Sequence, residues 1–405
     1  MNDDKVLDGV RVVEVSMYAF APSAAAVLAD WGADVVKVVP PKVADPMMGT
    51  PIAGLPKKDV GVAFMWEILN RGKRCIALDI STDDGRGVLR DLVAGADVFI
   101  TNLLPGARQR FGIEPDDLFA VKDSLVYARA TGHGPEGPER DAGGYDHTDF
   151  WARAGIGHAA SMVSDEFVPQ PGPAMGDLSA GVTLAGAIAA ALYRRSATGK
   201  GTLIDVSLLS TAMWVGSPAV VASQLYGVDT IPRMRHLELP NPLVAAYRTR
   251  DDRLVYLAGI QTEGHFENFC EVVERRDLLD DARFATGADR LVNRVALIEL
   301  LDEHFATRDL ADWLVALRGL TTPWTVIQTA AEAATDPQVA ANHYVTQVDG
   351  PAGPFPLVAS PAQFDGMPPA LAPAPDHGQH TEEILLELGR SWDEILELKA
   401  SDAVL

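Results

Sequence analysis

The sequence is poor in cysteine and in basic residues, and each shortage excludes a class of protein. Its 405 residues include only two cysteines, Cys75 and Cys270, which excludes a disulfide framework and a cysteine-built zinc site. Lys and Arg number 34 against 56 Asp and Glu, so the formal net charge is −22. Binding to nucleic acid or to an anionic membrane needs a basic face, so we expect neither as a partner.

Targeting and membrane-spanning signals are also missing. The first residues, MNDDKVLDGV, are acidic and lack an apolar core, which predicts that there is no signal peptide. The longest apolar stretch, 180–193, is too short to cross a bilayer and ends in two arginines. Together with the scarcity of cysteine, these features predict a cytoplasmic enzyme.

Several common site motifs do not occur. No G-x-G-x-x-G follows the first apolar segment, which disfavours a nicotinamide dehydrogenase. The chain also lacks a Walker A motif, a G-x-S-x-G elbow and an H-E-x-x-H motif, and its nine histidines are scattered. We therefore predict no metal site.

Short apolar segments alternate with helical ones through the first half of the chain. This alternation is typical of an α/β fold with a doubly wound, mostly parallel sheet of Rossmann type. Helices are predicted at 22–31, 82–93 and 180–195. Strands are predicted at 10–15, 34–39, 75–80, 97–101, 125–130 and 202–208.

Changes in pattern along the chain predict three parts. Residues 1–227 form the N-terminal part of a large Rossmann-like domain. Residues 228–340 form a smaller α+β domain, with a hairpin at 247–258 around Asp251-Asp252. Residues 341–405 contain a connector rich in proline and glycine, at 350–376, followed by two short helices that complete the large domain.

One acidic residue stands out for its neighbours. In Gly176-Asp177-Leu178-Ser179-Ala180-Gly181, Asp177 lies between small residues at the start of a predicted helix. One interpretation is a helix N-cap, which stabilises the first turn by about 1 kcal/mol. The other is a carboxylate nucleophile, because small neighbours admit a bulky substrate and free N–H groups at a helix start hold an oxyanion. The spacing alone favours the N-cap.

Five blocks of sequence, in order along nearly the whole chain, resemble the family III CoA-transferases. This family is also called CaiB/BaiF and includes formyl-CoA transferase-like and α-methylacyl-CoA racemase-like members. The blocks are LDGVRVVEVSMYAFAPSAAAVLADWGADVVKV (7–38), LNRGKRCIALDI (69–80), DVFITNLLPGARQRFG (97–112), AMGDLSAG (174–181) and GQHTEEIL (378–385).

The resemblance implies an activity and an assembly. In the family, the aspartate at the position of Asp177 attacks an acyl-CoA thioester. A mixed anhydride and then an aspartyl-CoA thioester form, and CoA passes to an acceptor carboxylic acid. Coenzyme A is therefore expected as an acyl-CoA co-substrate, and the resemblance implies two interlocked subunits in a homodimer. In that context the nucleophile becomes the leading interpretation of Asp177.

The resemblance also implies where substrates bind. A solvated surface charge is the alternative for each basic residue, and the motif match is strongest for Lys73 and Arg110. Apolar residues in the first loop favour a medium-to-large apolar acyl group. The implied CoA contacts are Arg71, Lys73, Arg74, Asn102, Arg108 and Arg110. The implied acyl-site residues are Tyr18, Ala19, Tyr145 and Gly176.

Two other functions stay open beside the transferase. An α-methylacyl-CoA racemase or epimerase of the same family uses a histidine in a G-H-D motif as a base. Here the motif is Gly144-Tyr145-Asp146, and a tyrosine with a pKa of about 10 is a poor base at neutral pH. A non-catalytic acyl-CoA-binding protein is disfavoured because Asp177 is present. An acyl-CoA:carboxylate CoA-transferase is the leading prediction.

Overall fold

The computed structural model describes residues 5–49, 51–56, 60–259 and 263–405. The chain forms two compact units. The larger consists of Met1–Ser161, Glu166–Ile231 and Pro337–Leu405, and the smaller of Met162–Asp165 and Pro232–Asp336. The domain boundaries at 227 and 340 stay a prediction, since a compact grouping does not test which segments fold independently.

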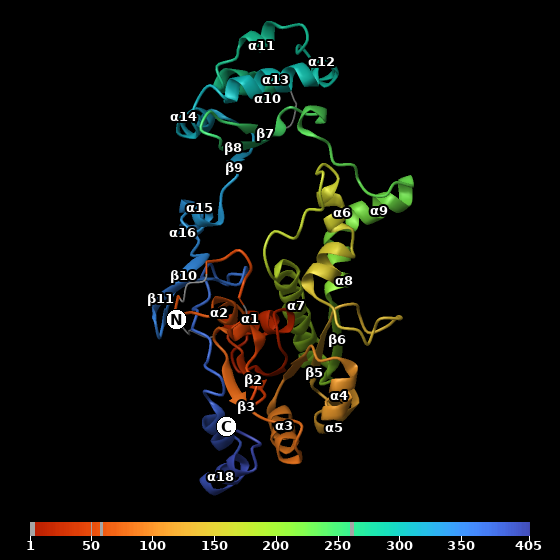
Figure 1. Ribbon diagram of the computed structural model, residues 1–405, viewed down its shortest axis with the longest axis vertical. Helices are drawn as coiled ribbons and strands as arrows, with labels where there is room; N and C mark the ends of the chain where they lie inside the picture. The colour runs from red at the N-terminus through yellow and green to blue at the C-terminus, as the bar shows by residue number, and fades with distance from the viewer. Residues whose placement is uncertain (1–4, 50, 57–59, 260–262) are drawn as a thin grey trace. The chain divides into compact units, whose positions relative to one another are not determined.

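The larger unit is built on a six-stranded sheet in the order β3-β2-β1-β4-β5-β6 (Figure 1). Every neighbouring pair in it is parallel, so the predicted α/β sheet of Rossmann type is confirmed. Strands of a parallel sheet with helices on both faces are rich in apolar residues, which is why these segments could be predicted from the sequence. The strands are β1 (Arg11–Val15), β2 (Asp34–Val39), β3 (Arg74–Ala77), β4 (Val98–Thr101), β5 (Val126–Thr131) and β6 (Thr202–Ser207).

Helices cover both faces of this sheet. Apolar side chains of α1 and α7 form a core with one face, and those of α3, α5, α17 and α18 form a core with the other. The helices of the larger unit are α1 (Phe20–Asp30), α2 (Phe64–Asn70), α3 (Asp83–Gly95), α4 (Pro105–Phe111), α5 (Pro115–Val121), α6 (Ile156–Ser161), α7 (Met175–Thr198), α8 (Leu208–Val215), α9 (Ser217–Tyr226), α16 (Pro337–Ala341), α17 (Thr381–Glu387) and α18 (Trp392–Ala400), with a 3-10 turn η1 (Pro46–Met48) and a π-helical segment η2 (Asp146–Ala152).

Helix α7 is the long central helix of this unit. It packs against α1 at Gly181, where an added Cβ would lie 1.9 Å from the Ser23 Oγ, so only glycine allows this approach. By length and composition α7 could cross a membrane, but Ala180, Leu184 and Ile188 on one side are fully buried in the core. The helix begins five residues before the predicted start at 180.

The C-terminal part of the chain completes the large sheet. The backbone N–H groups of Cys75 and Ala77 on β3 donate to the His380 Nδ1 (3.2 Å) and the Thr381 Oγ1 (3.1 Å). This contact covers the edge of β3 and satisfies backbone groups that would otherwise be free. The predicted connector at 350–376 is wrong at its start, because β10 (Val345–Gly350) and β11 (Gly353–Val358) form an antiparallel hairpin there.

The smaller unit has its own core around a three-stranded antiparallel sheet in the order β7-β8-β9. The predicted hairpin is confirmed as β7 (Val244–Arg248) and β8 (Leu254–Ala258). Trp313, Phe305 and Tyr247 are fully buried among its apolar side chains. The remaining elements are β9 (Trp324–Val326), α10 (Glu263–Val272), α11 (Asp277–Asp280), α12 (Gly287–Val292), α13 (Arg294–Phe305), α14 (Leu310–Ala316) and α15 (Ala330–Ala333), with 3-10 turns η3 (His236–Glu238) and η4 (Leu317–Gly319).

Candidate active site

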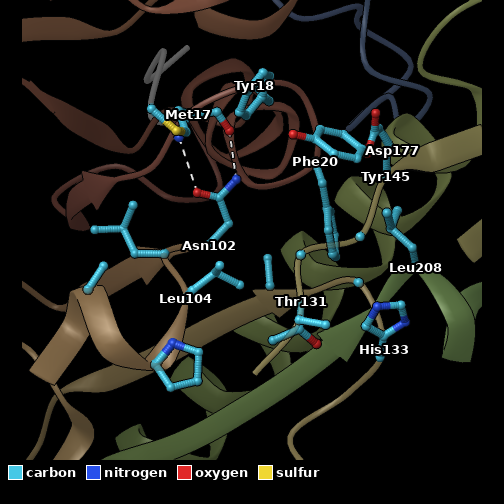
Figure 2. A pocket seen from close by; sticks show the side chains of 18 of the residues that line it. Met17, Tyr18, Phe20, Asn102, Leu104, Thr131, His133, Tyr145, Asp177 and Leu208 are labelled. Carbon is cyan, nitrogen blue, oxygen red and sulfur yellow. Dashed lines mark hydrogen bonds between the residues drawn. The ribbon is translucent and has the colours of Figure 1, made fainter. Parts of the chain in front are cut away.

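A cavity of about 330 Å³ lies at the carboxyl ends of the central strands (Figure 2). Its wall includes Met17–Phe20, which follow β1, and Asn102–Pro105, which follow β4. The strand order reverses between β1 and β4, and ligands of doubly wound sheets bind at such a switch point. Residues 131–133 at the carboxyl end of β5, Tyr145, Asp177 and Leu208 complete much of the wall.

Asp177 reaches this cavity from the first turn of α7. The helix begins at Met175 with Ala174 in the left-handed region (φ +61°) as its N-cap, so the N-cap interpretation of Asp177 is wrong. Its backbone carbonyl accepts a hydrogen bond from the Ser23 Oγ (3.2 Å). Among the described residues nothing donates a hydrogen bond to its carboxylate, and no cation pairs with it. The carboxylate oxygens therefore keep their lone pairs for a ligand.

A second carboxylate sets the electrostatics around Asp177. Burial, and then the charge of Asp146, raise the pKa of Asp177 to about 7. Asp146 is itself buried and accepts hydrogen bonds from the Gly176 N–H (2.9 Å) and the Gln170 Nε2 (2.6 Å). A Cβ on Gly176 would lie 2.3 Å from the Asp146 Oδ1 and 2.3 Å from the Phe150 Cγ, so glycine is required at this position. Gly176 therefore shapes the site from behind the cavity wall.

Two tyrosines face each other in the cavity wall. The rings of Tyr18 and Tyr145 are perpendicular, with centroids 5.8 Å apart. Tyr18 has a φ of +63°, a strained conformation for a residue with a side chain, and such strain is frequent at functional sites. Ala19, the N-cap of α1, also lines the cavity. The structure thus brings Tyr18, Ala19 and Tyr145 together with Asp177 in one cavity, and their contact with an acyl group stays a prediction.

Asn102 fixes the loop that carries Tyr18. Its Oδ1 accepts a hydrogen bond from the Met17 N–H (3.1 Å), and its Nδ2 donates to the Met17 carbonyl (2.6 Å; dashed lines in Figure 2). Both ends of the amide are therefore engaged within the protein. Asn102 lines the cavity, but its contact with CoA stays a prediction.

The two predicted cations of α4 differ in their surroundings. Arg108 lines the cavity, yet it is buried and donates to the Leu103 carbonyl (2.6 Å) and to the Glu114 carboxylate (3.2 Å). Arg110 is exposed with its guanidinium over the Phe111 ring, 4.6 Å from the centroid, and has no carboxylate partner in the part of the chain that the structure describes. It lies outside the cavity lining.

The three predicted cations around β3 are engaged elsewhere. The Lys73 ammonium, fully buried, donates to the Glu14 carboxylate (2.6 Å), the Pro22 carbonyl (2.9 Å) and the Asn70 Oδ1 (3.0 Å). Arg71 forms a buried pair with Asp30 (2.7 Å). Arg74 pairs with Asp34 at the opposite, amino end of the strands. CoA contacts by these three residues stay a prediction that the geometry does not support.

Two polar residues of the cavity wall, His133 and Arg140, were not predicted from the sequence. Both lie in the loop after β5, where a parallel sheet places its ligand-binding residues. Glycines at 132, 134, 137, 143 and 144 mark this loop in the sequence and could have directed attention to it. Close packing explains two of them, since the Cα of Gly132 would lie 2.8 Å from a Cβ on Gly144.

Comparison with known proteins gives a consistent result. The model of CoA-transferase family III matches residues 7–381. (R)-2-Hydroxy-4-methylpentanoate CoA-transferase of Clostridioides difficile is 32% identical over 98% of this chain and 99% of its own. Succinyl-CoA:glutarate CoA-transferase of Homo sapiens is 30% identical over 97% of this chain and 88% of its own. A crystal structure of a CaiB/BaiF family protein from Brucella suis superposes with a TM-score of 0.81 at 29% identity, over 95% of this chain and all of the other.

Proposed function

The chain belongs to CoA-transferase family III and is an enzyme, and we propose that it moves CoA between carboxylic acids through covalent intermediates on Asp177. The observation that carries this proposal is the free carboxylate in the cavity. A buried carboxylate without hydrogen-bond donors or a cation is a better nucleophile than a paired one, because no partner withdraws its charge.

The proposed reaction balances without a metal or a redox partner. A carboxylate oxygen of Asp177 attacks the thioester carbonyl carbon, the C–S bond breaks, and CoA thiolate leaves an acyl-aspartyl anhydride. The thiolate then attacks the Cγ of Asp177, which releases the first acid and leaves an aspartyl-CoA thioester. The acceptor carboxylate repeats both steps in reverse and leaves as its CoA ester. No proton is gained or lost overall.

The lining of the cavity supports an acyl group of medium to large size and mostly apolar character. Met17, Phe20, Leu104 and Leu208 contribute apolar side chains to the wall beside Asp177 (Figure 2). The named relatives act on a branched hydroxy acid and on dicarboxylates, so the comparisons alone leave the acyl group open. Burial of apolar surface favours a hydrocarbon chain here over a second carboxylate.

We propose that the phosphates of CoA bind near exposed cations whose side chains are free to reorient. Arg110 is exposed on α4 without a carboxylate partner among the described residues. Arg140 lines the cavity, and its side chain, 59% exposed, forms a long ion pair with the exposed Asp141 (3.5 Å). In a chain of net charge −22, these are the cations best able to turn toward an anionic ligand.

A homodimer, interlocked as the resemblance implies, forms part of the proposal. The larger unit exposes large apolar side chains on three helices, among them Tyr193 on α7, Trp214 on α8 and Tyr226 on α9, each 80% exposed. Large apolar side chains exposed to this degree are consistent with cover by a partner. Light scattering should give twice the 43.3 kDa of one chain.

The deciding experiment is intact-protein mass spectrometry after incubation with a panel of acyl-CoAs, followed by a hydroxylamine trap. Hydroxylamine releases the acid or CoA and leaves a hydroxamate on Asp177, so an adduct of the same mass is expected from every donor. Each acyl-CoA is therefore incubated separately, and the one that gives the adduct on the peptide that contains Asp177 is a donor. Absence of any adduct, together with solvent deuterium entering the α-carbon of a 2-methylacyl-CoA, would replace this proposal with the racemase.

A further inference from the structure

Asp146 is a second carboxylate beside the site that the steps of the proposed reaction do not use. It is the first residue of η2, is 5% exposed and lies outside the cavity lining. Its Oδ1 accepts a hydrogen bond from the N–H of Gly176 (2.9 Å), the residue directly before Asp177. Asp146 therefore binds the start of α7 as an N-cap side chain would, although it lies 30 positions earlier in the chain.

Neutral donors hold Asp146 in its charged form. Its Oδ2 accepts a hydrogen bond from the Gln170 Nε2 (2.6 Å), so each carboxylate oxygen has one N–H donor. Hydrogen bonds to the charged form favour that form over the protonated one. No cation pairs with Asp146 within residues 5–49, 51–56, 60–259 and 263–405. Its negative charge is thus fixed in position without being cancelled.

The orientation of Gln170 agrees with a negative charge on Asp146. Gln170 is 6% exposed, and its Nε2 also donates to the Gly172 carbonyl (3.0 Å). Its Oε1 is buried and has no partner in the part of the chain that the structure describes, which costs free energy. Turning the amide over would place this oxygen against the Asp146 carboxylate, where two acceptors would face each other. Gln170 therefore acts on Asp146 through its N–H alone.

The fixed charge of Asp146 acts on Asp177 only while Asp177 is itself charged. Two like charges near each other disfavour the state in which both are present. Uptake of a proton by Asp177 ends this repulsion, and so does a covalent bond to its carboxylate. In the aspartyl-CoA thioester of the proposed reaction, Asp177 is neutral and the first acid has left with the negative charge. The other titratable side chains of the cavity lining are Tyr18, Arg108, His133, Arg140 and Tyr145, and none of them pairs with Asp177 among the described residues.

We propose that Asp146, held ionised by Gln170 and the Gly176 N–H, shifts Asp177 from the free carboxylate toward the aspartyl-CoA thioester. The inference rests on the proposed transferase function. Asp146 and Gln170 are positioning residues, because both act through Asp177. The overall equilibrium between the two CoA esters is unchanged, since the free enzyme is regenerated in each cycle. What changes is the form of the enzyme that accumulates between the two half-reactions.

The test measures this internal equilibrium directly. The enzyme is mixed at pH 8 with a donor acyl-CoA and its free acid in a known ratio, quenched in acid, and the thioester is quantified by intact-protein mass spectrometry. In Asp146→Asn the ratio of thioester to free enzyme should fall by ~3–10-fold, because the repulsion that the thioester relieves is gone. The acid dissociation constant of Asp177, taken from the pH profile of kcat/KM, should rise by a similar factor, since a proton and CoA neutralise the same charge.

Two variants of Gln170 separate the charge of Asp146 from a merely structural effect. Gln170→Met removes one donor, so Asp146 takes up a proton more readily and the ratio should fall by ~2–5-fold. Gln170→Glu can share one proton with Asp146, which keeps at least one negative charge on the pair, and should not lower the ratio. Asp116→Asn, an exposed acid on α5 outside the cavity, is the control and should leave the ratio unchanged.

Three results would overturn the inference. The ratio of thioester to free enzyme could be native in Asp146→Asn. The ratio could fall there without a matching change in the pH profile, which would make the effect structural. Gln170→Met could behave as the native enzyme, which would remove the role assigned to Gln170. A native enzyme that forms no covalent state with any donor would instead contradict the transferase proposal itself.

Discussion

Two carboxylates of the larger unit that are withdrawn from water, Glu14 and Asp177, have opposite properties. Glu14 on β1 lies between the ammonium groups of Lys37 (3.0 Å) and Lys73 (2.6 Å). Burial alone would raise the pKa of Glu14, but the charges of the two lysines outweigh it and hold the pKa at about 2. Asp177 is buried with Asp146 as its charged neighbour, and its pKa is raised to about 7. Burial is common to both, so the cations decide which acid is inert and which is reactive.

The inert acid still contributes to the site through its lysines. Lys37 donates to the Ser16 carbonyl (3.1 Å) and Lys73 to the Pro22 carbonyl (2.9 Å). The Ser16 carbonyl precedes Tyr18, and the Pro22 carbonyl lies in the first turn of α1, which follows Tyr18, so the two bonds hold the chain on either side of this cavity residue. The charge cluster of Glu14, Lys37 and Lys73 thus anchors one wall of the cavity. Asp177, in another wall, has no such partner.

Removal of the reactive carboxylate should give the largest effect. Asp177→Asn keeps the shape of the side chain but removes the nucleophile, so transfer activity should fall by ~10⁴-fold and the trapped adduct should disappear. Steady-state transfer assays and intact mass spectrometry measure both. Binding of CoA, followed by calorimetry, should persist as the control. A variant that kept a tenth of the native rate would contradict the comparison, because the unpaired acid would not be the nucleophile.

Breaking the charge cluster should damage stability first and substrate binding second. Lys73→Met leaves Glu14 with one lysine, and removing one partner of a buried ion pair costs ~3–5 kcal/mol of unfolding free energy. The Pro22 carbonyl loses its donor, so the KM for acyl-CoA should rise by ~10-fold as the Tyr18 loop loosens. Urea unfolding and steady-state kinetics measure the two effects.

Arg290→Met provides the matched control for the lysine variant. Arg290 is also a fully buried cation, but it lies in the smaller unit, where it bonds to the Phe284 carbonyl (2.9 Å) and pairs with Glu263. It should lose stability without the rise in KM. An equal rise in both variants would show that the effect on KM is a general consequence of a weakened fold.

Neutralising the two acids should change stability in opposite directions. The folded pKa of Asp177 lies above the unfolded value of about 4, so its ionisation costs stability as the pH rises from about 4 to about 7. Asp177→Asn should therefore be more stable than the native protein by roughly 1–3 kcal/mol at pH 8, with little difference at pH 4. Glu14→Gln should be less stable at pH 8. Urea midpoints at the two pH values would contradict this if both variants moved together.

The sheet was predictable because its strands are short segments rich in apolar residues that alternate with helical segments, and the location of Asp177 followed from the resemblance of its block. The charge cluster was not predictable, because Glu14 and Lys37 look like solvent-facing residues of strands, and Lys73 is 59 positions away from Glu14 in the chain. The first turn of α7 was missed because its N-cap is an alanine with a positive φ in place of a polar residue. His133 and Asp149 are 16 positions apart in no known motif, and only the fold brings them together.

The smallest effect concerns the acid that raises the pKa of Asp177. Asp146→Asn removes one of its two causes while an amide oxygen can still accept from the Gly176 N–H, so the pKa of Asp177 should move down. The reaction needs the carboxylate, so activity should rise with pH through about 7 in the native enzyme and at lower pH in the variant. At pH 6, activity as a fraction of each enzyme's own high-pH plateau should be ~2–5-fold larger in the variant than in the native enzyme.

Asp116→Asn provides the control, because Asp116 is an exposed acid in the first turn of α5 outside the cavity. It should leave the pH profile of kcat/KM unchanged. A profile that stayed in place for Asp146→Asn would mean that burial alone sets the pKa of Asp177, and that the absence of cations matters more than the presence of a second acid.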